Sequence, residues 1–493
     1  MLGPAAEPLE IDEDAAVPAP LLRWDQLVPL LPLAFALIGA VVLYWPSLDS
    51  PFVADDYVYL YSVRTLSFWH YLRLAVTPGT HDTTLFFVDN FWRPWYFLSF
   101  QATERLFGGH PVAYHVLNLA IHLGTVVLVW LVAWRLTRRA MAAGFAAVFF
   151  AVHPAGFEAV AWISSVNSIS VPLGLGAWLL FMRAVERSDA GKRAGPGYAV
   201  ALALLVGAIG FHESAFVEVA AMGGWLVLVQ RRDRWREWRS YLPLLPYVVL
   251  AAVYVAMRTR AFTQPMSVNA VFELSSSTPG QAWYYLKLGL FPFSDSTSAW
   301  HSVLERAGGA LLIAAFPLAV LLRRWVLAAV LLAFYVSVLP YSGLVLGVVP
   351  RYFYGPSAFL AIAVGVACGE AFAAMKRVPA AVAQGVVVAG CAVVVSAAAY
   401  VGNGRVTAWA AKDPGQNQAW VEQLQRKFPE LPAGGTLYVA NPPFILALFD
   451  GVTLQPTAGY YYPGLGRVVL FEKRDFLAVE AKLGPNDRVF VFD

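Results

Sequence analysis

Charge and cysteine are scarce in this chain. Only 14% of its 493 residues are charged, and Cys368 and Cys391 are its two cysteines. Both fall inside apolar runs, so no disulfide framework is predicted. Hydrophobic residues make up 59% of the chain, and the mean hydropathy is +0.58. A soluble protein of this length does not have that balance, and the composition therefore predicts a multi-pass membrane protein.

Common phosphate-binding motifs are also missing. The sequence has no GxxxxGK[ST] loop and no strand-linked GxGxxG, so no nucleotide site is predicted. Residues 1–24 are rich in Pro, Ala, Asp and Glu and have no basic region ahead of the first apolar run, which argues against a cleaved signal peptide. We expect them to form a disordered cytoplasmic tail. The net charge of +3 does not indicate nucleic-acid binding.

Apolar runs of about 20 residues cross a bilayer as helices, and about eleven such runs are present, several of them short. Clusters of Arg and Lys follow alternate runs, and eleven crossings place all of these clusters on one side, which is then cytoplasmic. The N-terminus is expected inside and the C-terminus outside an inner (plasma) membrane. A shorter run, 281–293, is predicted to lie at the outer interface. The eleven runs lie near residues 26–46, 111–134, 140–153, 168–184, 197–211, 214–230, 241–257, 307–322, 325–341, 357–374 and 379–400.

An acid pair, Asp55 and Asp56, follows the first run in PFVADDYVYL. Two adjacent carboxylates cannot both be buried and ionised cheaply, so one tends to have a raised pKa, as a general base requires. The alternative is a loop turn or a helix cap with solvated charges.

Other polar residues converge on the same, extracytoplasmic face in this orientation. A single His or Glu at the end of a span often only caps a helix or reaches the interface. Four separate turns that carry such groups are harder to explain as caps alone. The candidate site-lining residues are Arg93, His115, His153, Glu158, His212, Glu213, Arg351 and Tyr352. On the second run, His115, Asn118 and His122 share one helix face, and we expect His122 to bond another helix.

Acids and arginines at lipid depth suit a substrate that is itself a lipid phosphate. Arginine pairs with phosphate bidentately, and we expect Arg351, with Arg93 as the competing candidate, to bind it. We expect one acid of the pair to deprotonate an acceptor hydroxyl, which then displaces the phosphate from the anomeric carbon of a sugar. Asp55 is the favoured base, with Asp56 orienting the acceptor or its partner, and the reverse assignment stays open. No obligatory cofactor and no metal ligands are predicted, although a divalent metal stays open.

An ordered set of motifs resembles a known family. FVADDY, WRPWYFLSF, FGGHPVAYHVLNLAIH, FFAVHPAGFEAVAWISS, GFHESA, YLKLGLFPFSDS and PRYFYGPS occur in that order. Over roughly residues 30–375 the chain resembles the transmembrane O-mannosyltransferases, which often carry tetratricopeptide repeats and belong to the GT-C superfamily. The resemblance implies a polyprenyl-phosphate donor of mannose or a similar hexose, inverting transfer on the extracytoplasmic face, and Asp55 and Asp56 as the signature acids.

Three departures from the family pattern leave the sugar and the acceptor open. No 34-residue repeat follows residue 400, His212 stands where lysine is common, and WRPW replaces the usual Tyr-Arg-Pro-Leu. The expected partners are the bilayer, the lipid-linked sugar, and an acceptor that is a protein, a lipid or a glycan, with no nucleic acid. The rival function is a multi-pass transporter of a lipid-linked or anionic substrate, which would place its ionisable groups near the midplane.

The composition changes after Tyr400. We predict three parts: the tail 1–24, a GT-C-like catalytic helical bundle 25–402, and a small extracytoplasmic α/β domain 403–493. The last part should contain a helix near 417–428 and strands in TLYVA, RVVLF and RVFVF. It could position the acceptor, cover the site, or only pack. Tyr460, Tyr461 and Tyr462 are either contacts to headgroups or glycan, or ordinary strand residues.

Overall fold

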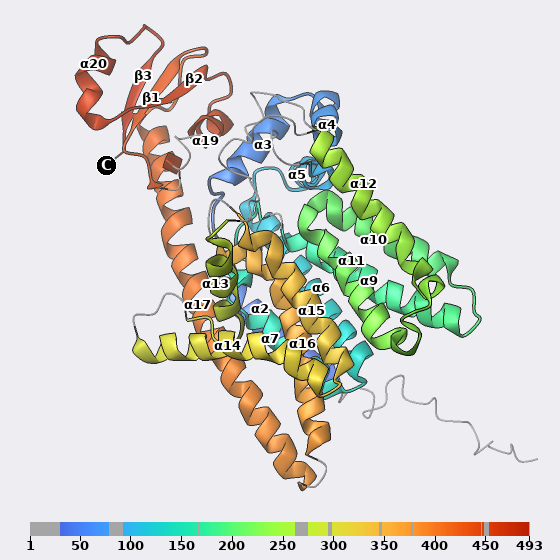
Figure 1. Ribbon diagram of the computed structural model, residues 1–493. Helices are drawn as coiled ribbons and strands as arrows, with labels where there is room; N and C mark the ends of the chain where they lie inside the picture. The colour runs from blue at the N-terminus through green and yellow to red at the C-terminus, as the bar shows by residue number, and fades with distance from the viewer. Residues whose placement is uncertain are drawn as a thin grey trace, which may run out of the picture.

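The computed structural model describes residues 30–77, 92–165, 167–261, 275–293, 298–344, 348–375, 378–444, 446–447 and 453–492. The predicted tail 1–24 lies outside them. The described chain is mainly helical, with a helical bundle that carries a small sheet at one end (Figure 1). The prediction of a mainly α, multi-pass bundle with a small C-terminal α/β part is confirmed.

In the described part of the chain, which enters the first run at residue 30, all eleven predicted apolar runs form helix. Among the described residues, seven helices are long and apolar enough to span a membrane by length and composition, and three shorter apolar helices accompany them. The run 214–230 departs most from regular geometry, because it divides into a 3-10 turn, an α-helix and a π-turn. The bundle helices are α2 (Leu31–Tyr44), α6 (Pro111–Thr137), α7 (Ala140–Val152), α9 (Asn167–Asp189), α10 (Gly195–Phe211), η3 (Glu213–Phe216), α11 (Val217–Trp225), η4 (Leu226–Gln230), α12 (Leu245–Ala261), α14 (Ala299–Leu321), α15 (Trp325–Ser342), α16 (Tyr354–Ala374) and α17 (Ala380–Lys427).

Shorter helices connect or cap the bundle. The segment predicted at the outer interface forms α13 (Thr278–Leu290), which packs on α14 and α15. The remaining short helices are η2 (Trp45–Ser47), α3 (Asp55–Thr65), α4 (Phe68–Val76), α5 (Pro94–Phe107), α8 (Gly156–Ala161), η5 (Arg232–Arg234), η6 (Trp238–Leu244) and η7 (Pro350–Phe353).

Small residues let the helices around α7 approach closely. Ala142, Ala143 and Ala146 are at most 1% exposed, and α7 packs against α2, α6 and α16. A Cβ at Gly365 of α16 would lie 2.5 Å from the Ala142 carbonyl oxygen, so only glycine permits this contact. Apolar helices in lipid gain little from hydrophobic burial against each other. Their association is stabilised instead by close van der Waals packing, which small residues allow.

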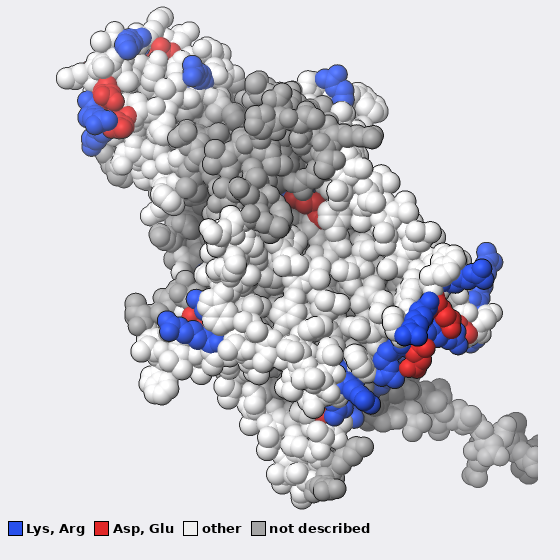
Figure 2. All heavy atoms as spheres, in the orientation of Figure 1, with Lys and Arg blue, Asp and Glu red and all other residues white. Residues whose placement is uncertain are grey.

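The two ends of the bundle differ in character. Helices α3, α4 and α5 project from one end, which we call the site end (Figure 1). Figure 2 shows Lys and Arg, interspersed with Asp and Glu, along the opposite margin of the bundle, and an acidic group set among uncharged residues near the site end.

The C-terminal unit begins inside α17, which runs unbroken through the predicted boundary at residue 402. The helix expected near 417–428 is therefore the last part of α17. The three predicted strands form β1 (Thr436–Ala440), β2 (Arg467–Leu470) and β3 (Arg488–Val491), which pair in parallel in the order β2-β1-β3. Short helices α19 (Leu454–Tyr461), η8 (Lys473–Asp475) and α20 (Phe476–Glu480) complete the unit.

The core of this unit forms between α17 and the sheet. Trp420 and Leu424 of α17 pack against Leu437, Val439 and Phe490 of the strands, and all five are at most 1% exposed. Tyr460 and Tyr461 belong to α19, and Tyr462 follows it as its C-cap. The alternative that these three tyrosines are strand residues is therefore wrong.

Candidate active site

The acid pair opens α3 from a strained turn. Asp55 and Asp56 are its first two residues, and Ala54 before them has φ 43° and ψ −102°. Residues other than glycine hold a positive φ only at a cost, and such strain often marks functional sites. Acids in the first helical turn also face its unpaired N–H groups, which favours negative charge there.

Asp56 serves as a buried tie between two loops. Its side chain is 1% exposed, and its carboxylate accepts hydrogen bonds from the backbone N–H of Val53 and of Ser164, each at 2.8 Å. Burial raises the pKa of Asp56 to about 7, although these N–H donors act to lower it. Its two oxygens are thereby committed to holding the strained turn against the loop that follows α8.

Asp55 differs from its neighbour in both exposure and bonding. It is partly exposed, and within the described part of the chain its carboxylate makes no hydrogen bond or ion pair. Burial raises the pKa of Asp55 to about 6, and the positive charge of Arg351 limits the rise. A carboxylate with this pKa is ionised at neutral pH and can accept a proton.

Arg351 lies on η7 and faces the acid pair from across the site. Its Nη1 donates to Glu158 Oε2 at 3.2 Å, and its guanidinium stacks 5.1 Å from the Trp162 ring centroid and 5.3 Å from that of Tyr352. Tyr352 in turn stacks on Tyr341 at 5.0 Å with nearly parallel rings. The Arg351 side chain is 28% exposed, so this cation remains accessible.

Arg93 is bound more tightly than Arg351. Its Nε and Nη2 donate to the two oxygens of Glu213 at 2.8 Å each, and its side chain is 12% exposed. His212 lies 3.2 Å from Arg93 Nη2 and uses its other ring nitrogen to accept the N–H of Ser214. This bidentate pair joins the start of α5 to η3.

The remaining predicted histidines sit in structural positions. His115 bonds the Ser50 carbonyl at 2.8 Å, and His153 bonds the Gly289 carbonyl at 3.0 Å while accepting the Ala155 N–H. Both rings are at most 2% exposed. His122 contacts the Tyr354 hydroxyl at 3.0 Å, which is the interhelical bond expected for it.

Three contributors to the site were not singled out by sequence reasoning. Ser164 acts through its backbone N–H, which leaves no side-chain signature. Trp162 supplies a ring to Arg351, and Tyr59 lies near enough to interact electrostatically with both Asp55 and Arg93. An excess of Trp and Tyr near the first outer acids was the available signal, but membrane interfaces carry the same excess.

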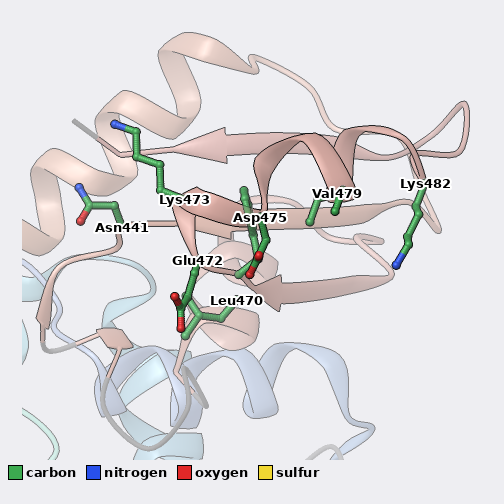
Figure 3. Close-up of a pocket in the computed structure, with 9 residues that line it drawn as sticks. Asn441, Leu470, Glu472, Lys473, Asp475, Val479 and Lys482 are labelled. Carbon is green, nitrogen blue, oxygen red and sulfur yellow. The ribbon is translucent and has the colours of Figure 1, made fainter.

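Other candidate sites are weaker. No group of three or more His, Cys, Asp or Glu side chains is arranged to hold a metal ion among the residues that the structure describes. A groove of about 1020 Å³ lies in the C-terminal unit, between Asn441 after β1, the end of β2 and α20 (Figure 3). Its charged lining residues, Glu472, Lys473, Asp475 and Lys482, come from other elements than those that carry the acid pair.

Solved structures define the fold class. The chain superposes on the apo oligosaccharyltransferase of Archaeoglobus fulgidus with a TM-score of 0.53 and 10% identity, over 91% of this chain and 65% of that one. It superposes on ArnT of Cupriavidus metallidurans bound to undecaprenyl phosphate with a TM-score of 0.50 and 15% identity, over 92% and 95% of the two chains. The chain therefore has the GT-C-like fold of these two structures.

Sequence similarity is narrower and points to particular relatives. The chain is 34% identical over 134 residues to the protein O-mannosyl-transferase Tmtc1 of Drosophila melanogaster, which covers 25% of this chain and 14% of that protein. It is 29% identical over 182 residues to the protein O-mannosyl-transferase TMTC1 of Mus musculus, and this match covers 34% of this chain and 18% of that protein. The matched region thus spans less than a fifth of either relative. No protein-family model matches the chain.

Proposed function

We propose that this protein is an inverting membrane glycosyltransferase, which moves mannose or a similar hexose from a polyprenyl-phosphate donor to an acceptor hydroxyl on the extracytoplasmic face. The GT-C fold, the resemblance to O-mannosyl-transferases and the acids at the site end support it. The donor and the acceptor are assigned by chemical class only. The acceptor is a protein Ser or Thr, with a lipid or polysaccharide hydroxyl as the alternative.

The proposal rests on the different hydrogen bonding of the two carboxylates in the acid pair. Asp56 spends both carboxylate oxygens on backbone N–H groups, whereas the carboxylate of Asp55 accepts no hydrogen bond within the described part of the chain. A purely structural pair would be expected to use both acids as caps. Asp55 is therefore the base, and Asp56 holds it in place.

The reaction follows from the placement of Asp55 and Arg351. Asp55 takes the proton of the acceptor hydroxyl, and the acceptor oxygen bonds to the anomeric carbon on the face opposite the phosphate. The bond from that carbon to the phosphate oxygen breaks, and polyprenyl phosphate leaves with the electron pair. Arg351 offsets the negative charge that the leaving phosphate gains. Attack on the opposite face inverts the anomeric configuration.

Substitution of each acid by asparagine tests this assignment. Asp55→Asn should lower turnover by about 10²–10⁴-fold without lowering Tm, because a positioned base is lost and no hydrogen bond breaks. Asp56→Asn should lower both turnover and Tm, since an amide cannot accept both N–H bonds, at a cost of about 1–3 kcal/mol. Turnover is measured on purified protein in nanodiscs with a polyprenyl-phosphate hexose. Near-wild-type turnover in Asp55→Asn would refute the assignment.

A further inference from the structure

The segment that carries the acid pair is contacted by the C-terminal unit. Tyr57, directly after Asp56, has its hydroxyl 2.8 Å from the hydroxyl of Tyr461 on α19. The Tyr57 ring lies 5.4 Å from the Tyr460 ring and 5.7 Å from the Tyr461 ring, centroid to centroid. Tyr57 is 1% exposed, so this contact between residues about 400 positions apart is a packed one.

A second contact lies on the other side of the strained turn. Asn417 of α17 is fully buried, and its Nδ2 donates to the Phe52 carbonyl at 3.1 Å. Ala54, with its positive φ, lies between Phe52 and Tyr57. A strained backbone persists only when its surroundings hold it on more than one side. Asn417 and Tyr461 supply part of that support from outside the bundle.

Close packing extends along α3. The guanidinium of Arg64 lies 3.9 Å from the centroid of the Tyr460 ring. A Cβ at Gly459 would lie 2.5 Å from the Tyr61 ring, so glycine is what allows α19 to seat on α3. Figure 1 shows α19 beside α3 at the site end. The contact therefore runs from the start of α3 to its last turn.

We infer that the C-terminal unit positions the acid pair of the transferase, with Tyr461, Gly459 and Asn417 holding the strained start of α3 in its reactive geometry. This inference rests on the proposed function. These three are positioning residues, because they act through α3 and not on the sugar. The unit is thus a part of the catalytic apparatus and not only a cover over it.

Two variants and one matched control test the inference. Tyr461→Phe removes only the hydroxyl that meets Tyr57, and Gly459→Ala pushes α19 away from Tyr61. Tyr462→Phe is the control, because the Tyr462 hydroxyl donates to the Phe428 carbonyl within the C-terminal unit at 2.6 Å. Amide hydrogen exchange of residues 52–64, turnover, donor KM and the pH profile are measured for each variant in nanodiscs.

The expected results separate positioning from general destabilisation. Tyr461→Phe should lower kcat about five-fold, the effect of one net hydrogen bond, and Gly459→Ala should lower it more. Exchange in 52–64 should speed up, donor KM should stay unchanged, and the acidic limb of the pH profile should move to lower pH as water reaches the acids. Tyr462→Phe should change none of these quantities.

Two outcomes would contradict the inference. Unchanged exchange in both Tyr461→Phe and Gly459→Ala would show that α19 does not hold α3. If exchange became faster while kcat and the acidic limb of the pH profile stayed equal to those of Tyr462→Phe, the ordering of α3 by α19 would be irrelevant to the reaction. Either result overturns the inference. The proposed function fails by a different result: Asp55→Asn would retain transfer in the same assay, whatever the exchange rates show.

Discussion

Replacement of Arg351 by lysine probes the phosphate contact directly. The bond from Arg351 to Glu158 is 3.2 Å long, beyond the 2.7–2.9 Å usual for charge-assisted pairs, so little is lost when a phosphate takes its place. Lysine keeps the charge but loses the planar fork, and with it about one charge-assisted hydrogen bond. That bond contributes about 1.5–3 kcal/mol, so donor Kd should rise about 10- to 150-fold.

Binding of a polyprenyl-phosphate hexose to purified protein in nanodiscs measures this effect. Arg93→Lys is the matched control, because Arg93 already donates two hydrogen bonds of 2.8 Å to Glu213. We expect Arg93→Lys to lower Tm and to leave donor affinity nearly unchanged. A headgroup anchor would tolerate lysine at Arg351. Unchanged donor binding in both Arg351→Lys and Arg351→Ala would refute the phosphate role.

Two further predictions concern titration and topology. The kcat/KM should fall as pH drops below about 6, because burial raises the folded pKa of Asp55 to about 6 and its protonated form cannot act as a base. Arg351→Ala should move this limb to higher pH, since the charge that lowers the pKa is removed; a limb near pH 4 in the wild type would contradict the assignment. Cysteines introduced at Arg234 and Lys482, in a chain lacking Cys368 and Cys391, should react with an impermeant reagent from opposite membrane sides, and labelling from the same side would rule out the orientation.

The apolar helices and the three strands could be predicted from local sequence, whereas the short helices α3, α4, α5, α8, α19 and α20 were not predicted. Each apolar run became a helix, because backbone N–H and C=O groups in lipid must pair within the segment. The runs TLYVA, RVVLF and RVFVF became strands for the same local reason, a high content of β-branched and aromatic residues. The boundary predicted at residue 402 falls inside α17, which continues as one helix to Lys427, so the change of composition there marks no break in the helix.

Candidate site residues could be found from the sequence, but not their partners. Asp55, Arg351 and Arg93 were visible as polar groups next to apolar runs. Their bonds were not, because Arg351 meets Glu158 across 193 positions and Arg93 meets Glu213 across 120. Such pairs depend on which loops the packed helices bring to one end.

Sequence by itself determined the apolar periodicity, the side on which the basic residues gather, and the presence of two adjacent acids. Only the tertiary structure distinguished those acids, since Asp56 is bonded by backbone N–H groups of two separate loops and Asp55 is not. It also brought α19 against α3, a contact between tyrosines that read as interface or strand residues in isolation. Hydrophobicity is a property of each residue, whereas burial and hydrogen bonding depend on neighbours that only the fold supplies.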